Sequence, residues 1–148
     1  MSAMHDIVIV GGGLVGSSLA IALDGSGLRV ALVEAALPQV AAQPSYDERN
    51  LALARASINA LGALGVWACV EQAPAPIRRI HISRRGAFGS AQLDAEELGL
   101  PEFGAVLPAR ELGNALLHRL DACRDLDRIA PAQLTAIESQ GDAIGLGV

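Results

Sequence analysis

Six consecutive residues near the N-terminus have the glycine spacing of a nucleotide diphosphate loop. They are Gly11-Gly12-Gly13-Leu14-Val15-Gly16, which satisfies the pattern G-x-G-x-x-G. In this pattern the first glycine permits a tight turn, the second lets a diphosphate approach the backbone, and the third lets a helix lie close to a strand. The amide groups and the dipole at the helix start then favour the negative charge. The pattern is specific only where a strand precedes it and a helix follows.

The flanking residues predict this context. Residues 7–10 are β-branched and apolar, which predicts a strand buried on both faces. Residues 14–24 carry small or apolar side chains at helical spacing, and the glycines at 25 and 27 predict the end of that helix. Residues 29–34 predict a second buried strand. Strand, helix and strand together have the size of a βαβ unit.

A carboxylate, Glu34, ends the second predicted strand. At this position a carboxylate accepts hydrogen bonds from the ribose hydroxyls of adenosine. It would also repel a 2′-phosphate, which disfavours NADP at this site. The alternative interpretation is a structural glycine turn followed by a solvated Glu34.

The remainder of the chain predicts further helices and strands. Leu112, Leu116 and Leu120 lie four residues apart and predict a helix over residues 110–120. The other expected elements are a loop at 35–48, a mostly helical segment at 51–70 broken near Gly62 and Gly65, a strand at 77–83 pairing with 90–94, and short strands at 126–130, 134–138 and 143–148, with a hairpin turn at 141–143.

The composition excludes several classes of function. The chain has 148 residues, of which 51% are hydrophobic and 18% charged, with a formal net charge of −5. A nucleic-acid partner is disfavoured because phosphate neutralisation needs clustered Lys and Arg. Cys69 and Cys123 have no partners at metal-ligand spacing, so no metal site is expected. Neither a signal peptide nor a membrane span is recognisable, so we expect a cytoplasmic protein.

The segment from Ile7 to Glu34 resembles the FAD fingerprint of the glutathione-reductase-type flavoproteins. Beyond the glycines, that fingerprint continues at Ala20, Leu23, Gly27, Val30 and Glu34. A second block, Asp47-Glu48-Arg49-Asn50-Leu51-Ala52-Leu53 with Ser57, Leu61 and Leu64-Gly65-Val66-Trp67, is similar to the ubiquinone-biosynthesis hydroxylases. The similarity continues at His81-Ile82-Ser83, Arg85-Gly86, Val106, Leu112-Gly113, Leu116-Leu117 and Leu120, and it extends from about residue 5 to residue 140.

This resemblance implies a class A FAD-dependent monooxygenase. Such an enzyme uses NAD(P)H and O2 to hydroxylate a prenylated phenol, and the flavin carries the oxygen chemistry. The implied fold is α/β: a Rossmann-like FAD-binding βαβ domain with the beginning of an inserted β-rich substrate domain. We expect residues 1–76 and 109–148 to belong to the FAD-binding domain and residues 77–108 to the inserted segment. Association with the periphery of the inner membrane or with a biosynthetic complex stays open.

The resemblance also implies cofactor-binding residues but no catalytic residue. To the loop residues Gly11 to Gly16 and Glu34 we add Ala35, Arg49, Arg110 and Leu134. Arg49 either contacts the flavin or forms an ion pair with Asp47 or Glu48. Arg110 either contacts FAD or is a solvated residue at a helix start.

The two later flavin motifs of the family, an Asp-Gly pair and a Gly-Asp-Ala-Ala-His stretch, are not found in this chain. Gly141-Asp142-Ala143 lacks the following His and predicts a hairpin turn instead. We therefore expect an N-terminal FAD-binding part that does not turn over alone. Two alternatives are another FAD or NAD oxidoreductase, such as an amine oxidase or disulfide reductase, and a nucleotide-binding fragment. The disulfide reductase would need a Cys-x4-Cys pair, which is absent from the sequence.

Overall fold

A parallel sheet forms the nucleotide-binding end of the molecule. In the computed structural model, which describes residues 4–36, 49–86 and 88–148, β1 (Ile7–Val10), α1 (Leu14–Leu23) and β2 (Val30–Val33) follow one another as predicted. β8 (Leu126–Ile129) pairs with β2 in parallel, so the strand order is β1-β2-β8. The βαβ unit predicted from the sequence is confirmed.

The two strands of this unit differ in burial. All four residues of β2 are buried, as predicted. The prediction that residues 7–10 are buried on both faces is wrong, because β1 lies at the edge of the sheet. Ile9 reaches the core, whereas Val8 and Val10 are 37% and 51% exposed.

A second sheet contains β3 (Asn50–Ala54), β7 (Gly104–Pro108) and β4 (Ala75–Ile77), in the order β3-β7-β4. The prediction of a mostly helical segment at 51–70 is wrong at its start, because residues 50–54 form a strand. Antiparallel pairing with β7 outweighs the local helical preference of Leu and Ala there. The helical part is confirmed by α2 (Arg55–Ala63) and the short 3-10 helix η1 (Trp67–Cys69).

The strand predicted at 77–83 is divided between two sheets. β4 ends at Ile77 and pairs with β7, whereas β5 (Arg79–Ser83) pairs with β6 (Ser90–Asp94) as predicted. Pro76 lies in β4 at an edge of its sheet, where a residue without an N–H is tolerated.

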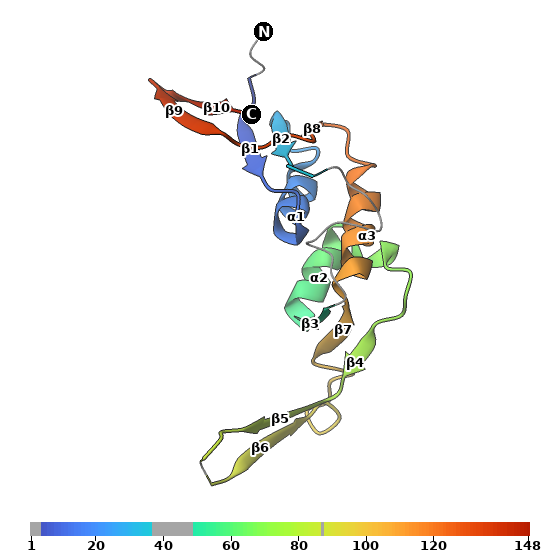
Figure 1. Ribbon diagram of the computed structural model, residues 1–148. Coiled ribbons are helices and arrows are strands. Elements are labelled where there is room, and N and C mark those ends of the chain that lie inside the picture. Colours follow the sequence, from blue (N-terminus) through green and yellow to red (C-terminus); the bar gives the residue numbers. More distant parts are fainter. Residues whose placement is uncertain (1–3, 37–48, 87) are drawn as a thin grey trace.

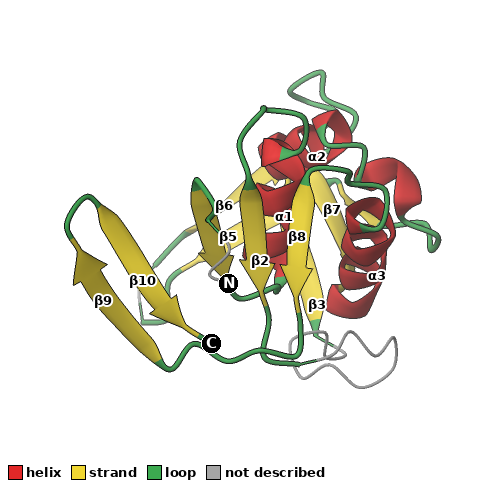
Figure 2. Ribbon diagram, turned by 90° about the horizontal axis from the view of Figure 1, so that it is seen from above, coloured by secondary structure: helices red, strands yellow, loops and turns green. Residues whose placement is uncertain are grey.

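The last helix and hairpin follow the prediction closely. α3 (Ala109–Leu120) contains the expected leucine face, and β9 (Ala136–Gln140) pairs with β10 (Ala143–Gly147) across the turn at 141–142. Figure 1 shows the hairpins β5–β6 and β9–β10 at opposite ends of the molecule, with the helices between them. Figure 2 shows β9–β10 standing apart from β2 and β8.

The core lies between the parallel sheet and helices α1 and α3. It is made of aliphatic side chains, and Trp67 packs against it while remaining partly exposed. The buried members include Ala20 and Ile21 from α1, Val30 and Leu32 from β2, and Leu112, Leu116 and Leu120 from α3. This packing fixes α1 against the sheet and so positions the glycine loop.

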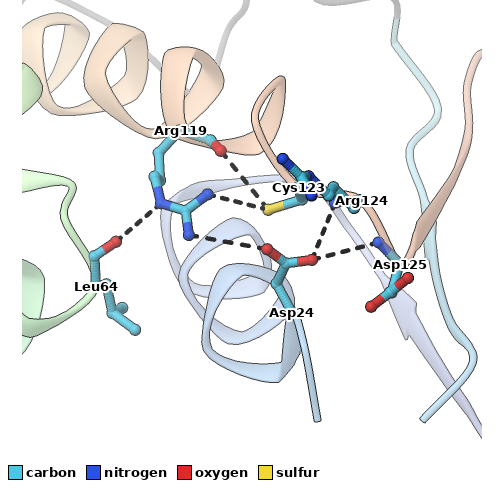
Figure 3. A network of polar contacts seen from close by, with 6 residues as sticks. All are labelled: Asp24, Leu64, Arg119, Cys123, Arg124 and Asp125. Atoms are coloured by element: carbon cyan, nitrogen blue, oxygen red, sulfur yellow. Dashed lines mark hydrogen bonds and ion pairs between the residues drawn. The ribbon is translucent and has the colours of Figure 1, made fainter. Parts of the chain in front are cut away.

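Arg119 of α3 connects this helix to Leu64, after α2, and to Asp24, at the end of α1 (Figure 3). Its Nε donates a hydrogen bond to the Leu64 carbonyl at 3.1 Å, and its Nη2 lies 3.8 Å from Oδ2 of Asp24. Asp24 ends α1, and its Oδ1 accepts hydrogen bonds from two consecutive backbone N–H groups, those of Arg124 and Asp125. These amides lower the pKa of Asp24, whereas burial and the Asp24 carboxylate raise the pKa of the neighbouring Cys123 thiol.

No helix in the described residues is long and apolar enough to cross a membrane. Within the same residues, no group of three or more His, Cys, Asp or Glu side chains is arranged to hold a metal ion.

Candidate functional site

The glycine loop connects the end of β1 to the start of α1. Gly11 has a φ of +102°, a conformation that favours glycine, and its N–H donates to the Val33 carbonyl at 2.8 Å. A Cβ on Gly16 would overlap the Gly11 carbonyl oxygen, so α1 can lie this close to the loop only because residue 16 has no side chain.

At Gly13, unlike Gly11 and Gly16, neither the backbone conformation nor a neighbouring atom excludes a side chain. The Gly13 φ of −70° is ordinary for any residue, and a Cβ built there would meet no atom within 4 Å. The protein itself therefore does not require glycine at this position. A ligand that approaches the backbone at Gly13 would require it, which is the role that the motif predicts for the second glycine.

The start of α1 is electrostatically suited to an anion. Gly13 is the N-cap residue and makes no side-chain capping bond, and the first turn contains no acidic residue. By contrast, α3 carries Glu111 in its first turn. Because the first N–H groups of a helix lack partners within the helix, an approaching phosphate would complement both these groups and the helix dipole.

Glu34 lies beside the glycine loop, immediately after β2. Its Oε2 accepts a hydrogen bond from the Gly12 N–H at 2.6 Å, and its Oε1 accepts one from the Ala36 N–H at 2.9 Å. Its own backbone joins β8, because its N–H donates to the Ile129 carbonyl and its carbonyl accepts from the Ala132 N–H. The carboxylate is therefore fixed next to the loop, as a ribose-binding role requires.

The other predicted site residues lie at several places. Leu14 and Val15 form the first turn of α1, where Val15 is 84% exposed. Ala35 is exposed next to Glu34, and Leu134 lies in the connection between β8 and β9.

Arg49 and Arg110 are far apart in the sequence but are close in the fold. The Arg49 carbonyl accepts a hydrogen bond from the Ala109 N–H at 2.8 Å, so Arg49 lies at the start of α3, where Arg110 follows. Arg110 Nε is 3.8 Å from Glu111 Oε1. The alternative partners of Arg49, Asp47 and Glu48, lie outside the described residues.

Sequence reasoning missed Ser17. Its side chain is fully buried, and its Oγ donates a hydrogen bond to the Gly12 carbonyl at 2.8 Å. This bond holds the middle of the loop against α1. Serine is common in helices and loops, so its position one residue after the last glycine gave no signal of this role.

The family comparison agrees with this geometry. The sequence profile of a family described as FAD binding domain matches residues 4–145. The chain therefore belongs to the FAD binding domain family, which defines the class of protein.

Curated relatives narrow the resemblance to ubiquinone hydroxylases. The chain is 32% identical over 142 residues to "Ubiquinone hydroxylase UbiL" of Rhodospirillum rubrum, covering 94% of this chain and 32% of the relative. It is 34% identical over 139 residues to "3-demethoxyubiquinol 3-hydroxylase" of Escherichia coli, covering 93% of this chain and 35% of the relative. The chain thus spans about a third of the length of these relatives. The predicted resemblance is confirmed over the matched segment.

Solved structures confirm the fold. The p-nitrophenol 4-monooxygenase PnpA from Pseudomonas putida DLL-E4 matches with a TM-score of 0.76 at 20% identity, covering 99% of this chain and 36% of that chain. PqsL, a probable FAD-dependent monooxygenase from Pseudomonas aeruginosa, matches with a TM-score of 0.71 at 20% identity. The match covers 95% of this chain and 36% of the PqsL chain. The predicted α/β Rossmann-like fold is therefore confirmed.

The residues present fit the ADP half of FAD. The open backbone at Gly13 and the uncapped start of α1 suit the diphosphate. The fixed carboxylate of Glu34 suits the ribose hydroxyls.

A pair of glycine-to-alanine variants separates ligand binding from folding. Gly13→Ala should lower the free energy of unfolding by less than about 1 kcal/mol, because the added methyl group meets only open space. It should weaken ADP binding by roughly tenfold or more, since a lost charged hydrogen bond costs about 1.5–3 kcal/mol. Gly16→Ala should instead lower the free energy of unfolding by about 1–3 kcal/mol, because the methyl group overlaps the Gly11 carbonyl.

Urea unfolding and calorimetric ADP titration of both variants measure these effects. Unchanged ADP affinity in Gly13→Ala would show that the diphosphate does not approach this loop.

Proposed function

We propose that this chain provides the ADP-binding part of an FAD-dependent hydroxylase that acts on a prenylated phenol in ubiquinone biosynthesis. The observation that carries the proposal is the geometry of the glycine loop and Glu34, which combines an open diphosphate site with a fixed ribose-binding carboxylate. The names of two curated relatives, a ubiquinone hydroxylase and a 3-demethoxyubiquinol 3-hydroxylase, support the choice of this substrate class.

Each group of residues has a defined role in this proposal. The backbone from Gly11 to Gly16 binds the diphosphate, and Glu34 orients the adenosine ribose. Arg49 and Arg110, brought together at the start of α3, provide positive charge toward the rest of the cofactor. FAD, when bound, supplies the oxygen chemistry, and the chain holds and orients it.

The proposal includes the reactants, the location and the domain division expected from the sequence. NAD(P)H is the electron donor and O2 the oxidant, and the protein is cytoplasmic. Residues 77–108 begin the substrate domain, and Ala35 and Leu134 contact the adenosine part of FAD. Peripheral membrane contact would bring the enzyme to a lipophilic phenol.

A second candidate is a nucleotide-binding part without turnover of its own. It is favoured by the same loop, whose geometry suits a nucleotide whether or not hydroxylation follows. Both candidates bind the nucleotide, so tracing the quinone product in cells is the measurement that separates them.

The choice of nucleotide tests the role of Glu34. ADP should bind better than 2′-phospho-ADP, because the 2′-phosphate replaces a ribose hydrogen bond with repulsion from the carboxylate. Glu34→Gln should reduce this discrimination and also weaken ADP binding, because an amide has only one oxygen for the two N–H donors of Gly12 and Ala36. Two charged ribose hydrogen bonds contribute about 1.5–3 kcal/mol each when shielded from water.

Glu138→Gln is the matched control, since Glu138 is exposed in β9 and the charge change is the same. Calorimetric titration of the wild type and both variants with the two ligands gives the affinities. If the wild type binds ADP and 2′-phospho-ADP equally, Glu34 does not hold the ribose.

Disruption of the gene tests the hydroxylase proposal in the cell. If the chain serves ubiquinone biosynthesis, its loss should lower ubiquinone and cause a prenylated phenol lacking one hydroxyl group to accumulate. Extraction and mass spectrometry of the quinones measure both. An unchanged quinone profile would favour the second candidate.

A further inference from the structure

A narrow hollow next to Glu34 is lined in part by Arg128, a charged residue that does not belong to the glycine motif. The hollow has a volume of about 20 Å³, and Gly12, Glu34, Leu117, Arg128 and Ala130 are among the residues that line it. This volume holds a single water molecule and is far too small for a purine. A base near this hollow would therefore lie over it, at the surface of the protein.

The order of the strands indicates where such a base lies. The glycine loop follows β1, Glu34 follows β2, and Arg128 and Ala130 lie at the end of β8, while the sheet order is β1-β2-β8. Neighbouring strands are about 4.8 Å apart. A nucleotide with its diphosphate at β1 and its ribose at β2 therefore extends its base toward β8.

Arg128 is held at this position by its neighbours. It lies opposite Leu32 in the parallel register of β2 and β8, two residues before the level of Glu34. Its Nη1 forms a 2.5 Å hydrogen bond with Asp121 Oδ1, just after the end of α3. The Arg128 side chain is 33% exposed, so the guanidinium is anchored at one edge and still accessible.

We propose that Arg128 recognises the base by stacking its guanidinium against the face of the adenine, an inference that rests on the proposed nucleotide site. A guanidinium is planar and weakly hydrated, and it stacks on aromatic rings. The hydrogen bond to Asp121, whose side chain is 70% exposed, restricts the positions of the guanidinium before the ligand binds. If Arg128 only stabilised the end of α3, replacing it would change the affinity equally for ligands with and without a base.

Two ligands distinguish stacking from a general effect of charge. ADP contains the base, and ribose 5-diphosphate has the same sugar and diphosphate without it. Arg128→Gln should weaken ADP binding by about 3- to 30-fold, the range expected for a planar guanidinium stacked on an aromatic ring, and leave ribose 5-diphosphate within twofold of the wild type. Arg128→Lys, which keeps the charge but loses the plane, should lose most of the same affinity.

Arg124→Gln is the matched control. Arg124 precedes β8 at the opposite end of the strand, and its replacement changes the net charge equally. This variant should bind both ligands like the wild type. Thermal unfolding of each variant shows whether the fold is retained, and Arg128→Lys keeps a cation beside Asp121.

Three outcomes would overturn the proposal: wild-type ADP affinity in Arg128→Gln, wild-type ADP affinity in Arg128→Lys, or equal losses for ADP and ribose 5-diphosphate. If instead the wild-type chain bound neither ligand nor FAD, the proposed nucleotide site itself would be wrong, and this inference with it.

Discussion

The contact between the start of α1 and the end of β1 determines the geometry of the candidate site. Gly16 lies so close to the Gly11 carbonyl that no side chain fits between them. This approach directs the N-terminal amides of α1 toward the turn at Gly11 to Gly13. Burial of Ala20 and Ile21 against β2 and α3 holds the helix there. If α1 moved outward by the width of a methyl group, its amides and dipole would no longer point at the same place.

The second constraint is the connection between the loop and the neighbouring strands. The Glu34 carboxylate accepts from the loop at Gly12, while the Glu34 backbone is bonded to Ile129 and Ala132 around the end of β8. The carbonyl of Gly12 in turn accepts a hydrogen bond from the Ser17 hydroxyl. Three neighbouring strands of the sheet thus contribute residues to one edge of it, and the proposed positions of the phosphate, ribose and base follow the strand order β1-β2-β8.

The sequence predicted the elements whose pattern is local. The βαβ unit was predictable because the glycines, the strand residues and Glu34 occur at fixed spacing, and α3 because its leucines repeat every four residues. The strand at Asn50–Ala54 was not predictable, because its pairing with Gly104–Pro108 depends on residues far away in the sequence. The exposure of Val8 and Val10 depends likewise on strand order, which composition does not encode.

The residues of the candidate site also fall into those predictable from local sequence and those that depend on distant contacts. Gly13 and Glu34 were identifiable from the motif, and their geometry fits the roles that it predicts. Ser17 and Arg128 were not, since Ser17 bonds to a buried backbone carbonyl and the position of Arg128 depends on the adjacency of β2 and β8. The meeting of Arg49 and Arg110 at the start of α3 also became visible only in the fold.

Backbone amide chemical shifts measured by NMR during an ADP titration test the central claim most directly. The account predicts that the largest changes occur at Gly12, Gly13 and the first turn of α1, followed by Glu34 and the end of β8. Changes confined to the opposite end of the sheet, where His5, Leu28 and Asp127 line a separate hollow, would contradict it.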